Sequence, residues 1–212
     1  MSKTFLAGWR LGGRSGLRPF LYHIPLPYRL IPKILRYRVG QEIRIDGWRF
    51  NLDYGIVYLR ERDTWRDYLP PGGLKGKIVL DVGAGCGETA KYFLENGARA
   101  VYAVENNEEA LTYLRLNAEG RPIHVEAEAF DPFKHILGQI DLVKLDIEGY
   151  EISLLTWLEA YPKANLNIVL EAHNVWMRDR FQALGFTQIR PPWITKDSQG
   201  GFPTCIMYRW KK

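Results

Sequence analysis

The chain has 212 residues, of which 46% are hydrophobic and 13% aromatic, so it can bury a substantial core in one domain. No apolar run reaches the roughly 18 residues of a membrane-spanning helix, and the N-terminus lacks the continuous apolar segment of a secretion signal, so we predict no transmembrane segment. The two cysteines, Cys86 and Cys205, do not form a metal-ligand pair, which favours a reducing, cytoplasmic location.

The charge is unevenly distributed along the chain. The net charge is +5, but residues 1–40 carry eight basic residues and no acid, which leaves a net charge of −3 on residues 41–212. Aromatic residues are interleaved with the basic ones: Trp9, Phe20, Tyr22, Tyr28 and Tyr37. Such a segment favours an anionic partner: RNA, an acidic membrane surface or an anionic substrate. The aromatic residues also suit packing against the rest of the protein.

The first 73 residues are predicted to form additions to a core domain. Pro25 and Pro27 prevent one long helix near the start. Residues 42–59 have the pattern of a β-hairpin that turns at Asp46-Gly47, with a further strand over Tyr54–Leu59. Residues 61–69 are predicted to be a helix that ends at the Pro-Pro-Gly-Gly run. We therefore predict an N-terminal part, residues 1–73, and a core domain, residues 74–212.

From Lys77 onward, strand patterns alternate with helical ones. Strands are predicted at 77–82, 100–105, 122–127, 140–146, 165–172, 186–190 and 203–209. Helices are predicted near 87–95, 107–118, 149–160 and 175–184. This alternation is typical of an α/β domain in which helices cover both faces of a parallel sheet.

The most informative motif follows the first of these strands. Gly83, Gly85 and Gly87 make a sharp turn into a helix, where a ligand approaches the backbone without meeting a Cβ. The next strand ends in Glu105, where an acid suits the two hydroxyls of a ribose. Glu88 stands where the dinucleotide fingerprint has its third glycine, and a carboxylate there would repel a pyrophosphate. These residues predict a nucleoside-containing cofactor, although one glycine-rich turn also suits a plain strand-to-helix connection.

The Asp-x-Gly-x-Gly-x-Gly run resembles the first motif of class I S-adenosylmethionine-dependent methyltransferases. The resemblance implies a doubly wound, seven-stranded, mainly parallel sheet with an antiparallel end, and S-adenosylmethionine as cofactor. It implies that the loop binds the methionyl part, that Glu105 with Asn106 binds the ribose, and that an acid after the third strand binds the adenine. Glu126 and Asp131 compete with Glu128 for that last role. The implied cofactor-binding residues are Asp81, Gly83, Ala84, Gly85, Gly87, Glu105, Asn106, Glu128, Ala129, Phe130 and Asp146.

A second motif follows the fourth strand. Lys144, Asp146, Glu148, Gly149 and Glu151 match the Lys-x-Asp-x-Glu-Gly-x-Glu phrase of the FkbM-like branch of these enzymes, and the fifth strand ends in a similar Glu-x-His. The resemblance covers residues 77–209. The acids also suit capping of the following helix, and Lys144 also suits an ion pair with Asp81 or Asp141.

Three residues are predicted to act in catalysis: His173, Asp146 and Glu148. His173 is the candidate general base, because an imidazole takes a proton from a hydroxyl or amine near neutral pH, although it also suits a hydrogen bond at the sheet rim. Asp146, Glu171 and His173 are also residue types that bind a divalent ion, but without a spacing rule no metal site is predicted.

The sequence thus predicts methyl transfer from S-adenosylmethionine to an unidentified acceptor. The FkbM-like resemblance implies a hydroxyl of a sugar, a lipid or another small molecule. The basic residues 1–40 favour RNA instead. A third hypothesis is a non-catalytic protein that binds the cofactor or a membrane surface.

Overall fold

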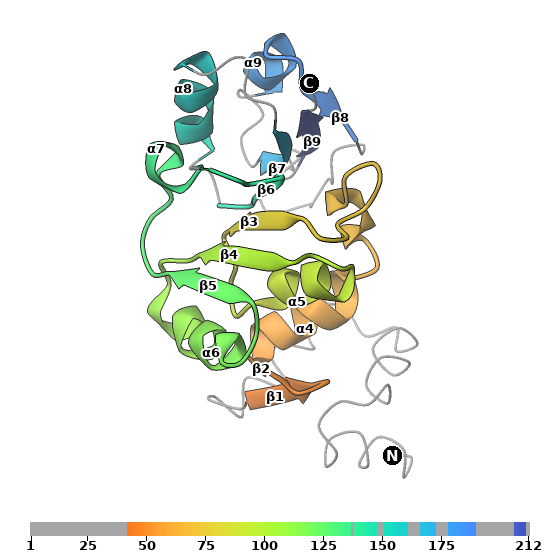
Figure 1. Ribbon diagram of the computed structural model, residues 1–212, viewed down its shortest axis with the longest axis vertical. Coiled ribbons are helices and arrows are strands. Elements are labelled where there is room, and N and C mark those ends of the chain that lie inside the picture. The colour runs from red at the N-terminus through yellow and green to blue at the C-terminus, as the bar shows by residue number, and fades with distance from the viewer. Residues whose placement is uncertain are drawn as a thin grey trace, which may run out of the picture.

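The computed structural model describes residues 42–136, 138–147, 151–160, 166–172, 178–189 and 206–210. The predictions for residues 1–41 lie outside the described residues. Figure 1 shows a central sheet with helices packed on both sides and a two-stranded hairpin near α4 and α6.

The predicted hairpin is confirmed. Strands β1 (Glu42–Ile45) and β2 (Trp48–Asn51) pair antiparallel, with Ile45 opposite Trp48. The backbone φ is 51° at Asp46 and 80° at Gly47, as a two-residue type I′ turn requires. Ile45, Trp48 and Phe50 are buried, so the hairpin lays one face on the domain.

The strand predicted over Tyr54–Leu59 is wrong, because helix α4 (Leu52–Glu61) occupies these residues. The Asn51 side chain caps the helix by accepting a hydrogen bond of 3.0 Å from the Tyr54 N–H. A Cβ on Gly55 would overlap the Ile43 side chain, so this glycine lets α4 pack closely on the hairpin. The predicted helix over 61–69 is only partly right: α4 ends at Glu61, and a 3₁₀ turn, η1, follows at Trp65–Tyr68.

The α/β class and the mainly parallel sheet are confirmed. The strands of this sheet within the described residues are β3 (Ile78–Val82), β4 (Ala100–Val104), β5 (Ile123–Glu126), β6 (Leu142–Leu145), β7 (Asn167–Ala172), β8 (Thr187–Gln188) and β9 (Ile206–Trp210). Their order is β5-β4-β3-β6-β7-β9-β8. Strands β3 to β7 are parallel, whereas β9 runs antiparallel to β7 and β8. The strand order reverses between β3 and β6, which is where open α/β sheets bind ligands.

Helices follow the strands in the predicted order. They are α5 (Glu88–Glu95), α6 (Glu108–Ala118), α7 (Pro132–His135), α8 (Ile152–Ala160) and α9 (Arg178–Ala183). The short α7 was not predicted; it begins at Pro132, and the Asp131 side chain caps it by accepting the Phe133 N–H at 2.9 Å.

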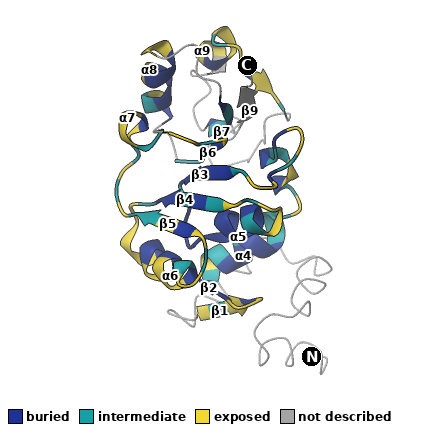
Figure 2. Ribbon diagram, viewed as in Figure 1, coloured by how far each residue is buried: buried dark blue, intermediate teal, exposed yellow. Residues whose placement is uncertain are grey.

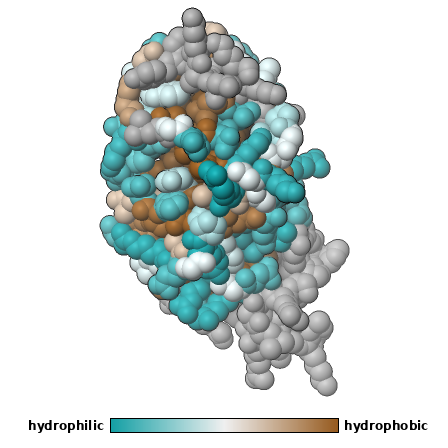
Figure 3. Space-filling model, in the orientation of Figure 1, coloured by the Kyte–Doolittle hydropathy of each residue, from teal (hydrophilic) through white to brown (hydrophobic). Residues whose placement is uncertain are grey.

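The sheet separates two hydrophobic cores. Val79 belongs to a core with the hairpin, α4, α5 and α6, whereas the next residue, Leu80, belongs to a core with α8 and α9. Figure 2 shows β3 buried, while the outer side of α6 is exposed. In Figure 3, hydrophobic residues gather in the middle of the visible face and hydrophilic residues surround them. The alternation of side chains along buried strands thus places helices on both faces.

The N-terminal part and the core domain share one of these cores. Phe50 and Tyr58 are fully buried in it together with Phe93 and Leu114. The boundary predicted at residue 73 therefore divides the sequence but not this core, and it stays a prediction. In the described part of the chain, no helix has the length and hydropathy needed to cross a membrane.

Asn117, in the last turn of α6, ties three segments together. Its side chain accepts a hydrogen bond from the Arg49 N–H at 2.8 Å and donates to the carbonyl oxygens of Arg49 and Cys86 at 2.6 and 2.8 Å. Asn117 is only 1% exposed. One buried amide therefore joins the hairpin and the glycine loop to α6.

We expect Asn117→Ala to lower the free energy of unfolding by about 3 kcal/mol, because it leaves buried backbone groups without partners. The control is Thr112→Ala on the exposed side of the same helix, where the hydroxyl donates only to the Glu108 carbonyl. Urea denaturation of both variants measures the difference. Equal, small losses would mean that water replaces the Asn117 side chain.

Candidate cofactor and active site

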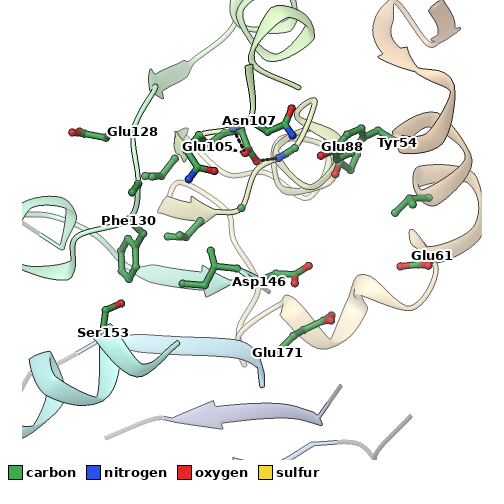
Figure 4. A pocket seen from close by; sticks show the side chains of 18 residues that line it. Tyr54, Glu61, Glu88, Glu105, Asn107, Glu128, Phe130, Asp146, Ser153 and Glu171 are labelled. Carbon is green, nitrogen blue, oxygen red and sulfur yellow. Dashed lines mark hydrogen bonds between the residues drawn. The ribbon is translucent and has the colours of Figure 1, made fainter. Parts of the chain in front are cut away.

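A cavity of about 670 Å³ lies at the carboxyl ends of β3 to β7, a size that suits a small ligand. Figure 4 shows Glu128 and Phe130 at one end of the cavity and Glu88 and Tyr54 at the other, with Glu105 between them. The predicted residues that line it are Gly83, Gly85, Glu105, Asn106, Glu128, Ala129, Phe130 and Asp146. Asp81, Ala84 and Gly87, predicted to belong to the loop, do not line the cavity.

The glycine loop is shaped by close contacts that exclude side chains. Gly83 has φ of 72°, and a Cβ there would overlap the carbonyl oxygen of Asp146 on the neighbouring strand end. Gly85 has φ of 55°, and a Cβ there would collide with the Glu88 carboxylate and the Tyr54 ring. Because Gly83 and Gly85 have no Cβ, the loop backbone packs directly against Asp146, Glu88 and Tyr54. Both glycines line the cavity.

We expect Gly83→Ala to destabilise the fold by about 3 kcal/mol, from left-handed backbone strain together with the overlap at Asp146. Gly72→Ala is the matched control: φ is 86° there, but a Cβ meets nothing within 4 Å. That control should lose only about 1 kcal/mol, the cost of the strain alone. Urea denaturation of both proteins measures the difference, and equal losses would remove the steric argument.

Glu105 is held by three backbone N–H groups. One oxygen accepts the Gly85 N–H at 2.8 Å, and the other accepts those of Asn106 and Asn107 at 2.9 and 2.8 Å. The carboxylate therefore joins the glycine loop to the start of α6, and its Oε2 atom, which within the described residues accepts only the Gly85 N–H, keeps a lone pair for a ligand. An acceptor in this fixed orientation suits the donors of a diol.

Beneath the loop, a buried ion pair supports the cavity floor. Asp81 and Lys144 are 0% and 1% exposed, and the Lys144 Nζ lies 3.3 Å from Asp81 Oδ1. Lys144 also donates to the Gly83 carbonyl oxygen at 3.0 Å, and the Thr89 hydroxyl donates to Asp81 at 2.6 Å. Burial alone would lower the pKa of Lys144, but Asp81 and three other nearby carboxylates raise it overall. The ion pair with Asp81 was one of the alternatives that the sequence left open.

At the other end of the cavity, Glu128 is the acid after β5 that lines the wall. Neither Glu126 nor Asp131 lines the cavity, and Asp131 caps α7 instead. Glu128 pairs with Lys134 and, at 3.1 Å, with His135 Nε2. Hydrogen bonding to Lys134 lowers the pKa of Glu128. Phe130 lines the cavity, and its ring stacks on that of His135 with the ring centroids 5.8 Å apart.

The remaining wall combines three acids from separate segments. Asp146 follows β6, Glu171 lies in β7, and Glu61 is the last residue of α4. Lys144 Nζ lies 4.0 Å from Asp146, and the Tyr68 hydroxyl donates a hydrogen bond to Glu171. Burial raises the pKa of Glu61; Glu171 adds to the rise and Arg60 opposes it.

The contribution of α4 to the wall was missed at the sequence level. Tyr54, Val57 and Glu61 all line the cavity. They recur at the i, i+3, i+7 spacing of one helical face, which is the signal that identifies them once the segment is known to be helical.

Two of the three predicted catalytic residues, His173 and Glu148, lie outside the described residues, as does Cys205. Among the residues that the structure does describe, no three His, Cys, Asp or Glu side chains gather closely enough to hold a metal ion. The catalytic roles of His173, Asp146 and Glu148 therefore stay predictions.

The residues present fit S-adenosylmethionine. A glycine loop without Cβ atoms, the oriented Glu105 carboxylate and the aromatic Phe130 suit a ligand that has an amino-acid part, a ribose and an adenine; which residue binds which part stays a prediction. Residues 80–146 match the family model described as a methyltransferase domain. The matched residues are less than half of the chain, and over them the chain is similar to a methyltransferase domain. S-adenosylmethionine is the methyl donor that this domain implies.

Curated relatives of the methyltransferase domain are similar over half of this chain. Protein arginine N-methyltransferase 6 of Danio rerio is 29% identical over 108 residues, which is 50% of this chain and 28% of the relative. Protein arginine N-methyltransferase 1 of Oryza sativa subsp. indica is 29% identical over 110 residues, or 50% and 26%. The match thus spans less than a third of these relatives.

Solved structures show the same fold as this domain. Precorrin-6y C5,15-methyltransferase of Geobacter metallireducens superposes with a TM-score of 0.51 at 21% identity, covering 71% of this chain and 87% of its own. A proposed transferase of Pyrococcus horikoshii gives a TM-score of 0.57 at 13% identity, covering 81% and 72%. At these identities the similarity establishes the Rossmann-like methyltransferase fold alone.

Proposed function

We propose that this protein transfers the methyl group of S-adenosylmethionine to an acceptor bound against Asp146 and Glu171. The supporting observation is that the cavity continues past the glycine loop to these carboxylates, which lie at the carboxyl ends of β6 and β7. An acceptor between the loop and the acids would have a base beside the atom to be methylated. Much of the rate acceleration would come from holding that atom in line with the methyl group.

We propose a hydroxyl as the acceptor group, on a sugar, a lipid or another small molecule. The Lys-x-Asp-x-Glu-Gly-x-Glu phrase and its resemblance to the FkbM-like branch support this assignment. Because a hydroxyl becomes a better nucleophile as it loses its proton, Asp146 or His173 would act as the general base.

A cationic acceptor is the second candidate, and one observation favours it. Glu61, Asp146 and Glu171 line the same wall, so a guanidinium or amine would find carboxylates there. The curated relatives are named as protein arginine methyltransferases. RNA is a third candidate, through the basic residues 1–40, but a phosphate at this acidic wall would be repelled.

Labelled methyl transfer from S-adenosylmethionine to separate pools of sugars, lipids, basic peptides and RNA tests these candidates. We expect label in a hydroxyl-containing pool, with Asp146→Asn and Glu171→Gln lowering kcat and with Glu171→Gln leaving the affinity for S-adenosylhomocysteine unchanged. Label found only in the peptide pool, or only in the RNA pool, would instead identify that class of molecule as the methyl acceptor. Binding of the cofactor without transfer to any pool would support a non-catalytic protein.

A further inference from the structure

Glu88 is a buried acid that the proposed reaction does not use. It is the first residue of α5, directly after the glycine loop, and is only 6% exposed. It lines the cavity, and within the described chain its Oε2 atom has no hydrogen-bond partner. Buried polar atoms are nearly always paired, so a lone carboxylate oxygen at the wall of a cavity indicates a missing ligand group.

The neighbours of Glu88 leave its charge uncompensated. Its carboxylate lies against Gly85, and the backbone N–H groups of Cys86 and of Glu88 itself lower its pKa. Tyr54 from α4 and Glu105 from the end of β4 line the same part of the cavity. Lys144 is the cation whose charge acts on Glu88, but it is paired with Asp81 and with the Gly83 carbonyl oxygen. Neither Tyr54 nor Glu105 brings a positive charge, so a positive charge that stabilises the carboxylate form of Glu88 has to come from a ligand.

Burial raises the pKa of Glu88 to about 8, Asp81 adds to the rise, and Lys144 and the two backbone N–H groups oppose it. Without a cationic ligand the group therefore holds a proton at neutral pH. A cation with N–H donors would favour the carboxylate form and supply donors to the unpaired oxygen.

The position of Glu88 in the cavity indicates which part of the cofactor would lie beside it. Glu128 and Phe130 lie at one end, Glu105 lies in the middle, and Glu88 lies with Tyr54 at the other end (Figure 4). With adenine and ribose at the first two positions, the methionyl part extends toward Glu88. We propose that Glu88 binds the α-ammonium group of the methionyl part. This proposal rests on S-adenosylmethionine being the cofactor.

Calorimetric titration of Glu88→Gln with three probes tests the proposal. S-adenosylhomocysteine and decarboxylated S-adenosylmethionine both carry the amino group, whereas 5′-methylthioadenosine lacks it. We expect the variant to bind the first two about 30-fold more weakly and 5′-methylthioadenosine as tightly as wild type. Glu108→Gln, an exposed acid at the start of α6 that does not line the cavity, is the matched control and should change none of the three.

Proton release gives a second readout that does not depend on turnover. As the ammonium binds, protonated Glu88 gives its proton to solvent and becomes the carboxylate that pairs with it. The observed binding enthalpy of S-adenosylhomocysteine at pH 6.5 should therefore vary with the ionisation enthalpy of the buffer in wild type and much less in Glu88→Gln. For the same reason, wild-type affinity should rise from pH 6 to pH 7.5, and that of the variant should stay flat.

Equal weakening of all three probes in Glu88→Gln would mean that Glu88 only shapes the loop, and unchanged binding of all three would mean that it has no role. Either result overturns the proposal while leaving the cofactor assignment intact. If wild-type protein bound none of the probes, the assignment of the cofactor itself would fail.

Discussion

Glu105→Ala is expected to weaken the binding of S-adenosylmethionine and S-adenosylhomocysteine about 100-fold, from the loss of a hydrogen bond to a charged acceptor together with the release of the glycine loop. Glu105 is the acceptor for the proposed ribose contact, and it also anchors the Gly85 N–H at 2.8 Å. The substitution removes the acceptor and frees the loop that faces the methionyl part. Both effects act on the same ligand, so the loss should exceed that from a single contact.

The measurement is calorimetric titration with both compounds, with NAD as a compound that should not bind. Glu108→Ala, three residues further along the chain, exposed and outside the cavity, is the control for a lost charge near the start of α6. Glu105→Gln should fall between wild type and alanine, because its one oxygen replaces part of the acceptor. If Glu105→Ala bound as tightly as the control, the ribose would lie elsewhere.

His173→Ala provides the contrasting variant. As the proposed general base it should leave cofactor affinity unchanged and slow turnover. Equal binding losses in Glu105→Ala and His173→Ala would contradict the division between a cofactor-binding acid and a catalytic histidine.

The strand and helix alternation after Lys77 could be predicted because it is local. Each buried strand is a short apolar run, and α5 and α6 begin directly after Gly87 and Asn107. Gly83, Gly85 and Glu105 could be placed together for the same reason: carboxyl ends of parallel strands meet at one edge of the sheet. The glycine motif and Glu105 therefore predicted both the fold class and the centre of the candidate site.

Tyr54–Leu59 shows why the rest could not be predicted. The segment has the aromatic and β-branched residues of a strand, but Asn51 caps a helix at its start. Gly55 fits that helix against Ile43, a contact visible only once the hairpin is in place. Because α4 was taken for a strand, the wall made by Tyr54, Val57 and Glu61 was missed. In the sequence, Glu88 stands out only as a departure from the dinucleotide pattern. Its importance depends on its burial at the cavity wall, which the sequence does not show.

Lys144→Met is expected to lower the free energy of unfolding at pH 7.5 by about 3–5 kcal/mol, the cost of removing one partner from a buried ion pair. Asp81 is completely buried and would keep only the Thr89 hydroxyl as a partner. The loss of the bond to the Gly83 carbonyl oxygen would also loosen the loop, so cofactor affinity should fall as well.

The destabilisation should depend on pH in a direction that identifies its cause. Burial raises the pKa of Asp81, while Lys144 and the Thr89 hydroxyl lower it; removing the lysine leaves only Thr89 to oppose the rise. A carboxyl with a raised pKa in the folded protein adds stability at low pH and loses it as pH increases. Lys144→Met should therefore be more destabilised at pH 8 than at pH 5.5.

The double variant Asp81→Asn/Lys144→Met separates the buried charge from lost packing. It removes both charges, so it should recover part of the stability and flatten the pH dependence measured by urea denaturation. Lys134→Met, which breaks an exposed pair with Glu128, is the control and should stay close to wild type. If the double variant were no more stable than Lys144→Met, the aliphatic chain of Lys144 would be the main contribution, and the charge of Asp81 a minor one.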